Sequence, residues 1–188
     1  PVLPLFVVPT TAGTGSETTI AAVVSDPHTN QKTPVIDPKL VPIAAALDPT
    51  LMLGLPPAIT AATGMDALTH AIESYISMHA APDTDYYAMA AVKMIMHNLP
   101  VCYNEGTNEP AREAMALASF YAGAAFTKAN LGYVHAIAHQ FGAFYHTPHG
   151  LANAIVLPYI LEYSQQAAAS RLADLAVATG VGEATENE

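Results

Sequence analysis

The stretch LGYVHAIAHQFGAFYHTPHGLANAIVLP, from Leu131 to Pro158, decides how the rest of the chain is interpreted. Its first half has the pattern of an apolar helix, in which His135 and His139 are four residues apart and project from one face. His149 follows in HTPHG, where proline and glycine indicate a turn, and the apolar run after it predicts another buried helix. Imidazole rings between apolar helical surfaces are costly to bury unless something pairs with them, and a metal ion does this well.

A second stretch, PPAITAATGMDALTHAIESYIS, predicts one long helix that begins at its prolines. Asp66 and His70 lie on this helix at positions i and i+4. One carboxylate and three imidazoles, from Asp66, His70, His135 and His149, would make a four-ligand site for a divalent transition metal. This mixture suits Zn²⁺ or Fe²⁺, because Ca²⁺ and Mg²⁺ prefer oxygen ligands. The spacing D-x-x-x-H is also common among ordinary core and surface residues, so both interpretations stay open at this point.

The segments GMDALTHAIESY and GYVHAIAHQFGAFYHTPHGLANAIVLP closely resemble the iron-containing, or group III, alcohol dehydrogenases. The ligand pattern of that family is Asp-x₃-His on one helix, followed by two histidines fourteen residues apart. Asp66, His70, His135 and His149 match this pattern without departure, and the resemblance runs from about residue 5 to residue 180. It implies a nucleotide-binding α/β domain followed by an all-helical domain, with metal and substrate in the cleft between them.

The expected fold is mainly α with a partial α/β portion, in the architecture that iron alcohol dehydrogenases share with dehydroquinate synthase. Short strands are predicted over residues 5–9, 20–24 and 32–37, and a buried strand over 41–49. From about Leu51 the pattern becomes helical. Residues 1–50 would therefore be the C-terminal part of the nucleotide-binding domain, and residues 51–188 an incomplete helical metal-binding catalytic domain. Compared with the family, the GGGS pyrophosphate loop and the last helices are missing, so we expect a piece of a longer dehydrogenase.

The resemblance implies NAD or NADP as a second cofactor. In the family the segment TTAGTGSE lies along this cofactor, which implies that Thr10, Thr11 and Ser16 contact its phosphates and its nicotinamide end. Lys32 matches a family lysine close to the nicotinamide ribose. The two glycines would let the backbone approach a ligand closely. Without the family, the segment would be an ordinary loop and Lys32 an ordinary charge of a β-hairpin.

His139 is an additional imidazole beside the predicted ligands, one helical turn after His135. The family implies a position next to the metal and the nicotinamide, where a neutral imidazole could relay the alcohol proton to water. The spacing alone is also compatible with a hydrogen bond that only orients a ligand. Glu73, about one turn after His70, is expected to support His70 in this way.

The composition narrows the range of partners. The net charge is −10 with six Lys and Arg residues and no basic cluster, which argues against nucleic acid. No apolar run reaches membrane-spanning length. The single cysteine, Cys102, excludes an internal disulfide and fits a cytoplasmic location. The expected partners are a small alcohol or aldehyde and a second copy of the chain in a dimer.

Three functions are compatible with these features. The favoured one is a metal-dependent, NAD(P)-linked alcohol dehydrogenase or aldehyde reductase, in which hydride passes between the nicotinamide and a small alcohol whose oxygen binds the metal. A metal-dependent hydrolase or lyase could use the same carboxylate and imidazoles to activate water. An inactive metal-binding fragment is the third alternative, because half of a cofactor site can fail to bind its cofactor.

Overall fold

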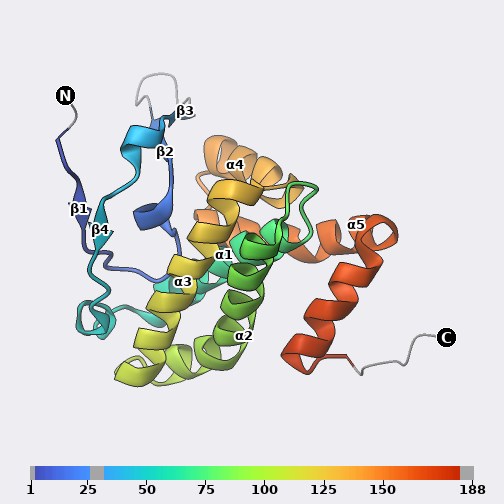
Figure 1. Ribbon diagram of the computed structural model, residues 1–188. Coiled ribbons are helices and arrows are strands. Elements are labelled where there is room, and N and C mark those ends of the chain that lie inside the picture. The colour runs from blue at the N-terminus through green and yellow to red at the C-terminus, as the bar shows by residue number, and fades with distance from the viewer. Residues whose placement is uncertain (1–2, 26–31, 183–188) are drawn as a thin grey trace.

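The computed structural model describes residues 3–25 and 32–182 (Figure 1). Within these ranges the chain forms five α-helices: α1 (Pro57–Tyr75), α2 (Pro82–Asn104), α3 (Glu109–Ala129), α4 (Tyr133–Tyr145) and α5 (His149–Thr179). The strands of the same ranges all precede them: β1 (Phe6–Val7), β2 (Ala21–Ser25), β3 (Lys32–Ile36) and β4 (Ala44–Ala45). Short 3₁₀ helices connect them: η1 (Ser16–Thr18), η2 (Pro38–Leu40) and η3 (Pro49–Met52). This order confirms the expected fold class, with a few strands followed by a helical unit.

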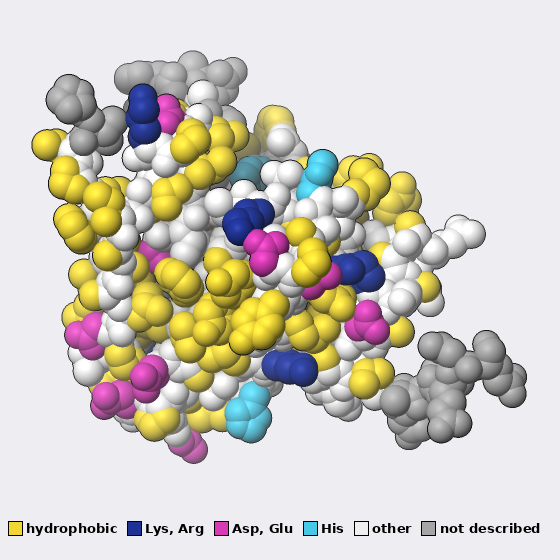
Figure 2. All heavy atoms as spheres, viewed as in Figure 1, with side chains coloured by type: hydrophobic (Ala, Val, Ile, Leu, Met, Phe, Trp, Pro, Cys, Tyr) yellow, Lys and Arg dark blue, Asp and Glu magenta, His cyan; other side chains and the backbone are white. Residues whose placement is uncertain are grey.

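The described strands form two separate pairs at one side of the helices (Figure 1). β1 runs parallel to β4 and β2 runs antiparallel to β3. The prediction of a buried strand over 41–49 is wrong, because β4 contains only two residues and Ile43 beside it is 68% exposed. β4 pairs with β1 alone among the described strands, so much of its surface stays open. Phe6 and Ile36 are also largely exposed, and apolar side chains gather over this region in Figure 2.

Small side chains let the helices approach one another closely. α1 packs against α2, α3 and α5, and α2 packs along α3. Fully buried alanines line these contacts, among them Ala67, Ala71, Ala91, Ala118 and Ala122. Short side chains bring helix backbones near each other, so polar groups on facing helices come within hydrogen-bonding distance. In the described ranges we find no helix both long and apolar enough to cross a membrane.

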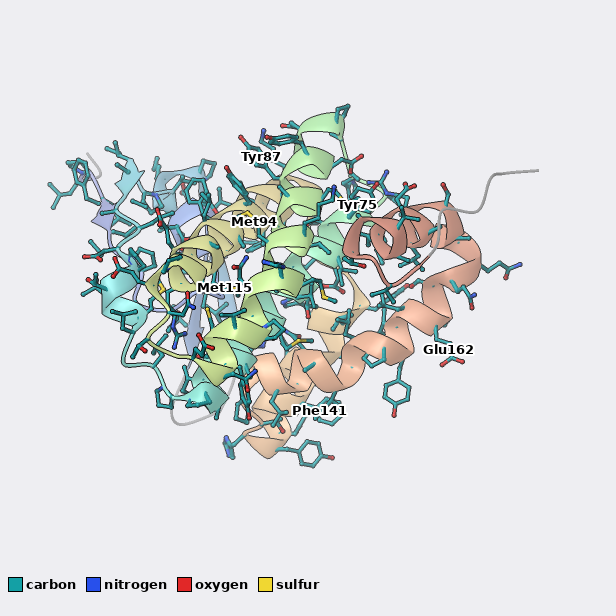
Figure 3. The ribbon with its side chains drawn as sticks, turned by 90° about the horizontal axis from the view of Figure 1, so that it is seen from below. Tyr75, Tyr87, Met94, Met115, Phe141 and Glu162 are labelled. Atoms are coloured by element: carbon teal, nitrogen blue, oxygen red, sulfur yellow. The ribbon has the colours of Figure 1, made fainter. Side chains whose placement is uncertain are left out.

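α5 bends at Ala168, where the backbone leaves helical geometry at φ −118° and ψ 19°. The part after the bend turns back over the end of α1, and Figure 3 shows Tyr75 close to it. Arg171 lies over the Tyr75 ring, 4.0 Å from its centroid, and donates hydrogen bonds to the Tyr75 carbonyl and to Asp85. The Tyr75 hydroxyl donates to Asp174 at 3.1 Å. These contacts anchor the end of α5 and leave its first turns to the site described below.

The glycine-rich segment 10–19 joins β1 to β2 and is fastened to α3. Gly15 has a φ of +58°, and a Cβ on it would lie 2.7 Å from the Cα of Gly123. Thr127 on α3 donates a hydrogen bond to the carbonyl of Thr18 at 3.1 Å. The segment therefore approaches α3 at a distance that only glycine allows, and it joins the strands to the helices.

We expect the substitution Gly15→Ala to lower the free energy of unfolding by about 1–3 kcal/mol, because it adds a clash to a left-handed backbone. Gly54→Ala is the matched control, since a Cβ there would meet nothing within 4 Å. Denaturant unfolding of both variants checks this. Equal stability of the two variants would contradict the close packing of the segment on α3.

Candidate metal centre

The four predicted ligands come from three helices and meet in one place. α1 contributes Asp66 and His70, α4 contributes His135, and α5 contributes His149. Asp66 Oδ1 lies 3.4 Å from His135 Nε2, 3.4 Å from His149 Nε2 and 3.6 Å from His70 Nε2. The structure thus brings together residues that are up to 83 positions apart, and the Asp66 oxygen is the atom they share.

The imidazole of His70 is held between two other rings. Its centroid lies 4.6 Å from that of His135, with the rings 11° from parallel, and 4.4 Å from the ring of Phe126 on α3. Asp66, His70 and His135 are buried, with exposed fractions of 3–4%. Rings packed on both faces cannot change rotamer without displacing a neighbour, so the packing fixes the position of His70 before any ligand binds.

The cluster opens to solvent on the side of α5. The side chain of His149 is 38% exposed, whereas that of Asp66 is 6% exposed. His139 is also exposed on this side, with its ring centroid 5.1 Å from that of His149 and 6.2 Å from that of His135. His149 and His139 are therefore the histidines of this region through which the cluster meets solvent.

The groups of the cluster shift one another's pKa values in different directions. Burial alone would raise the pKa of Asp66, but hydrogen bonds with His135 and His149 outweigh it and hold that pKa far below its usual range. Burial lowers the pKa of His70 to about 4, although the nearby Asp66 opposes the shift. The pKa of His135 is raised, because its contacts with Asp66 and Glu73 overcome the effect of burial. At neutral pH Asp66 is therefore a carboxylate and His70 a neutral imidazole.

Glu73 supports a different ligand from the one expected. Its Oε2 lies 2.6 Å from His135 Nδ1, and its Oε1 accepts the Val134 N–H at 2.7 Å. The expected support of His70 is wrong, because α4 crosses directly over Glu73. Gly132 permits this crossing, since a Cβ there would lie 2.9 Å from Glu73 Oε1. A carboxylate can only accept, so His135 Nδ1 carries a proton, and in the neutral ring this leaves Nε2 as the nitrogen that can bind a metal.

Asn153 belongs to the site, and sequence reasoning missed it. Its side chain is fully buried one turn after His149 on α5, and its Nδ2 lies 2.7 Å from Asp66 Oδ1. The same nitrogen is 3.2 Å from His135 Nε2 and 3.3 Å from His149 Nε2. The available signal was an amide four residues after a predicted ligand, in an otherwise apolar helix.

Three of the four donors, those of Asp66, His70 and His135, lie close enough together to hold a metal ion, and His149 is outside this group of three. Zinc binds imidazole nitrogen at about 2.0–2.1 Å, and the corners of a tetrahedron with such arms are about 3.4 Å apart. The distances of 3.4 to 3.6 Å from Asp66 Oδ1 to three imidazole nitrogens match that spacing. Asp66, His70 and His135 each offer a ligand atom within 4.8 Å of the others. Three nitrogens and one oxygen suit Zn²⁺ or Fe²⁺ better than Mg²⁺ or Ca²⁺.

Of the residues expected to contact a nicotinamide cofactor, those of the segment 10–19 lie near this cluster. Thr10 and Ser16 are exposed and Thr11 is half-buried. Their segment reaches α1 through Gly13, where a Cβ would be 2.6 Å from the Cβ of Thr63, one turn before Asp66. Lys32 begins β3 and pairs with Ser25 of β2. The contacts of these four residues with a cofactor remain predictions.

Comparison with known proteins identifies the family. Residues 60–188 match the Fe-containing alcohol dehydrogenase family, C-terminal, and residues 1–49 match iron-containing alcohol dehydrogenase. The chain therefore belongs to the iron-containing alcohol dehydrogenase family, which confirms the resemblance found in its sequence.

Several relatives have names that state an activity. Alcohol dehydrogenase 4 of Saccharomyces cerevisiae is 45% identical over 99% of this chain and 49% of its own length. The 1,3-propanediol dehydrogenase of Klebsiella pneumoniae is 49% identical over 96% of this chain and 46% of its own length, and the NAD-dependent methanol dehydrogenase of Bacillus methanolicus is 46% identical over 96% and 47%. The chain thus spans about half the length of these curated relatives.

Solved structures give the same result. A 1,3-propanediol oxidoreductase superposes with a TM-score of 0.92 at 48% identity, covering 98% of this chain and 47% of its own. A sulfoacetaldehyde reductase from Bifidobacterium kashiwanohense in complex with NAD⁺ superposes with a TM-score of 0.83 at 36% identity, covering 95% of this chain and 52% of its own. The arrangement of strands and helices described above is therefore that of this family.

We expect Glu73→Gln to weaken zinc binding by about 10- to 100-fold, because the amide no longer fixes the tautomer of His135. His135→Ala should weaken it further, since it removes a donor atom. Glu113→Gln on the exposed side of α3 is the control and should leave affinity unchanged. Competition with a chromophoric chelator measures all three, and wild-type affinity in Glu73→Gln would show that Glu73 does not orient His135.

Proposed function

We propose that this chain holds the metal centre and part of the nicotinamide site of a metal-dependent, NAD(P)-linked alcohol dehydrogenase that interconverts small alcohols and aldehydes. The observation that carries the proposal is the convergence of three imidazole nitrogens on Asp66 Oδ1 at 3.4 to 3.6 Å, in a cluster that meets solvent at His149. The names of the relatives support it, because they include an NAD-dependent methanol dehydrogenase and a reductase solved with NAD⁺.

Asp66, His70, His135 and His149 would hold Fe²⁺ or Zn²⁺. Such an ion, when bound, supplies a Lewis acid that polarises the oxygen of an alcohol or aldehyde. The Asp66 carboxylate offsets part of the charge of a dication, and this strengthens binding of the ion in a buried site. The half-exposed His149 marks the side from which substrate enters.

The segment 10–19 would place the cofactor. Gly13 of this segment contacts Thr63 on α1, and Thr63 lies three residues before Asp66. A nicotinamide lying along Thr10, Thr11 and Ser16 would therefore be close to the cluster. Hydride transfer is the chemistry of the nicotinamide itself, and the protein contributes position and electrostatics. Lys32 would approach the nicotinamide ribose from β3.

His139 would carry the proton. Its ring is exposed at the open side of the cluster, edge-on to His149. An imidazole in this position can accept the proton released when an alcohol is oxidised and pass it to water, and it can return the proton during aldehyde reduction. The His139 ring contacts those of His135 and His149, but His139 is not one of the four proposed ligands, so we expect its role in proton transfer to be separable from metal binding.

A hydrolase or lyase would use the same donors, but two observations favour the dehydrogenase. The chain belongs to a family of alcohol dehydrogenases, and the glycine-rich segment is fixed against the helix that carries Asp66. We further propose a homo-oligomer, most simply a dimer, because β1 and β3 expose apolar side chains next to strand edges. A cytoplasmic location agrees with the single, buried Cys102.

The first test of this function is metal content. Elemental analysis after dialysis should find one equivalent of zinc or iron for each chain, and Asp66→Asn should lose most of it because the site loses its charge. His97→Asn, at an exposed position of α2, is the control. In an enzyme completed to the length of its relatives, alcohol-dependent reduction of NAD should stop when a chelator removes the metal. A rate unaffected by complete metal removal would contradict the proposal.

The second test separates His139 from the ligands. In the completed enzyme, His139→Ala should retain its metal, whereas kcat for alcohol oxidation should fall by about 10²- to 10⁴-fold, the range expected for a positioned acid–base group. Steady-state kinetics with parallel metal analysis checks this. Loss of metal would make His139 a ligand, and an unchanged kcat with metal retained would make it a residue without a role in proton transfer.

A further inference from the structure

Asn153 is a buried amide whose position is not explained by packing. The helix around it is apolar, in the sequence LANAIVLP, and a side chain of similar size without polar atoms would fill the same volume. The Asn153 Oδ1 atom is buried and has no hydrogen-bond partner among the described residues. An unpaired buried acceptor is destabilising, so the other end of the amide must compensate for it.

That other end faces the donor atoms of the proposed metal centre. Asn153 Nδ2 donates to Asp66 Oδ1 at 2.7 Å, a short hydrogen bond of the kind that a carboxylate accepts. Its distances to His135 Nε2 and His149 Nε2 are 3.2 and 3.3 Å. The opposite orientation of the amide would bring its oxygen against the Asp66 carboxylate, and the two acceptors would repel each other. Asp66 therefore decides which way the amide points.

The cluster needs a donor at this place. His135 Nε2 lies 3.4 Å from Asp66 Oδ1, and when only Nδ1 carries a proton, as metal binding requires, Nε2 presents a lone pair to that oxygen, which is itself an acceptor. Acceptors that converge at 3.4 Å repel unless a proton donor or a cation lies between them. Among the described residues, Asn153 brings the amide protons that face both Asp66 and His135.

We propose that Asn153 is a positioning residue of this centre: its amide fixes which oxygen of Asp66 faces the imidazoles and holds the first turns of α5, with His149, against α1. The inference rests on the proposed function in that the centre it positions is the metal centre. Asn153 lies on the same face of α5 as His149, four residues later, so one hydrogen bond between α5 and α1 sets the position of two ligands.

Two substitutions in the 188-residue chain test the proposal at pH 8. Asn153→Ala removes the donor, and we expect its zinc affinity to fall by about 10- to 100-fold in a chelator competition. Asn153→Asp keeps the shape but sets a second carboxylate against Asp66. In the presence of chelator it should melt below both the unchanged protein and Asn153→Ala, because like charges are buried together. Saturating zinc should raise its melting temperature more than that of the unchanged protein, because the cation offsets both charges.

Asn98→Ala is the matched control, since the Asn98 amide donates to the Met94 carbonyl within α2, away from the cluster. Its zinc affinity should equal that of the unchanged protein. A buried carboxylate lowers the melting temperature whatever the role of Asn153, so the response to zinc decides: a zinc-induced rise for Asn153→Asp no larger than that of the unchanged protein would overturn the proposal. Unchanged zinc affinity in Asn153→Ala, measured beside a His135→Ala variant that has lost zinc, would overturn it as well.

The outcomes also distinguish this inference from the proposed function. If the unchanged chain bound neither zinc nor iron, the proposed function would fail, but the melting temperature of Asn153→Ala in chelator, compared with that of Asn98→Ala, would still judge the hydrogen bond to Asp66. If the unchanged chain bound zinc, and Asn153→Ala and Asn153→Asp bound it as tightly as the control Asn98→Ala, the proposed function would stand and Asn153 would have no part in it. If Asn153→Ala failed to fold, the isosteric Asn153→Asp would decide.

Discussion

The buried carboxylate of Asp66 is the constraint on which the rest of the structure depends. A charge that is 4% exposed at the junction of three helices is tolerated only when opposite charges or donors surround it. Asn153 Nδ2 at 2.7 Å and three imidazole nitrogens at 3.4 to 3.6 Å provide that surrounding. Because these groups come from α1, α4 and α5, satisfying one carboxylate also determines how the three helices cross.

Glu73 also joins two helices through hydrogen bonds, and it contacts His135 instead of Asp66. One of its oxygens accepts the Val134 N–H at the beginning of α4, and the other contacts His135 Nδ1. One side chain therefore caps the beginning of a helix and places a proton on one nitrogen of a histidine. Gly132 at that helix end has no side chain to cap it, and its lack of a Cβ is what admits Glu73. Helix capping and the orientation of a proposed metal ligand thus depend on the same side chain.

The strand portion is connected to this centre by close backbone contacts instead of a broad interface. Gly13 meets Thr63 on α1 and Gly15 meets Gly123 on α3, so the segment that we propose to lie along the cofactor is held against the helix that carries Asp66. The strands themselves expose Phe6 and Ile36 to solvent. The helical unit and the glycine-rich segment are therefore packed closely together, and this is the part that the proposed chemistry requires.

The sequence by itself determined the helices, because i, i+4 spacing and apolar periodicity are local properties that a helix converts directly into a shared face, and it gave the four candidate ligands through its resemblance to the family, since their spacing alone left them open. It also determined the family, through two long motifs. Only the tertiary structure decided that Glu73 serves His135 instead of His70, that Asn153 completes the cluster, and that β4 is short and open. These features depend on which helix crosses which and at what distance. The crossing of the helices is set by side-chain volume at contacts between residues far apart in the sequence, such as the missing Cβ of Gly132. The spacing of residues along one helix does not reveal it.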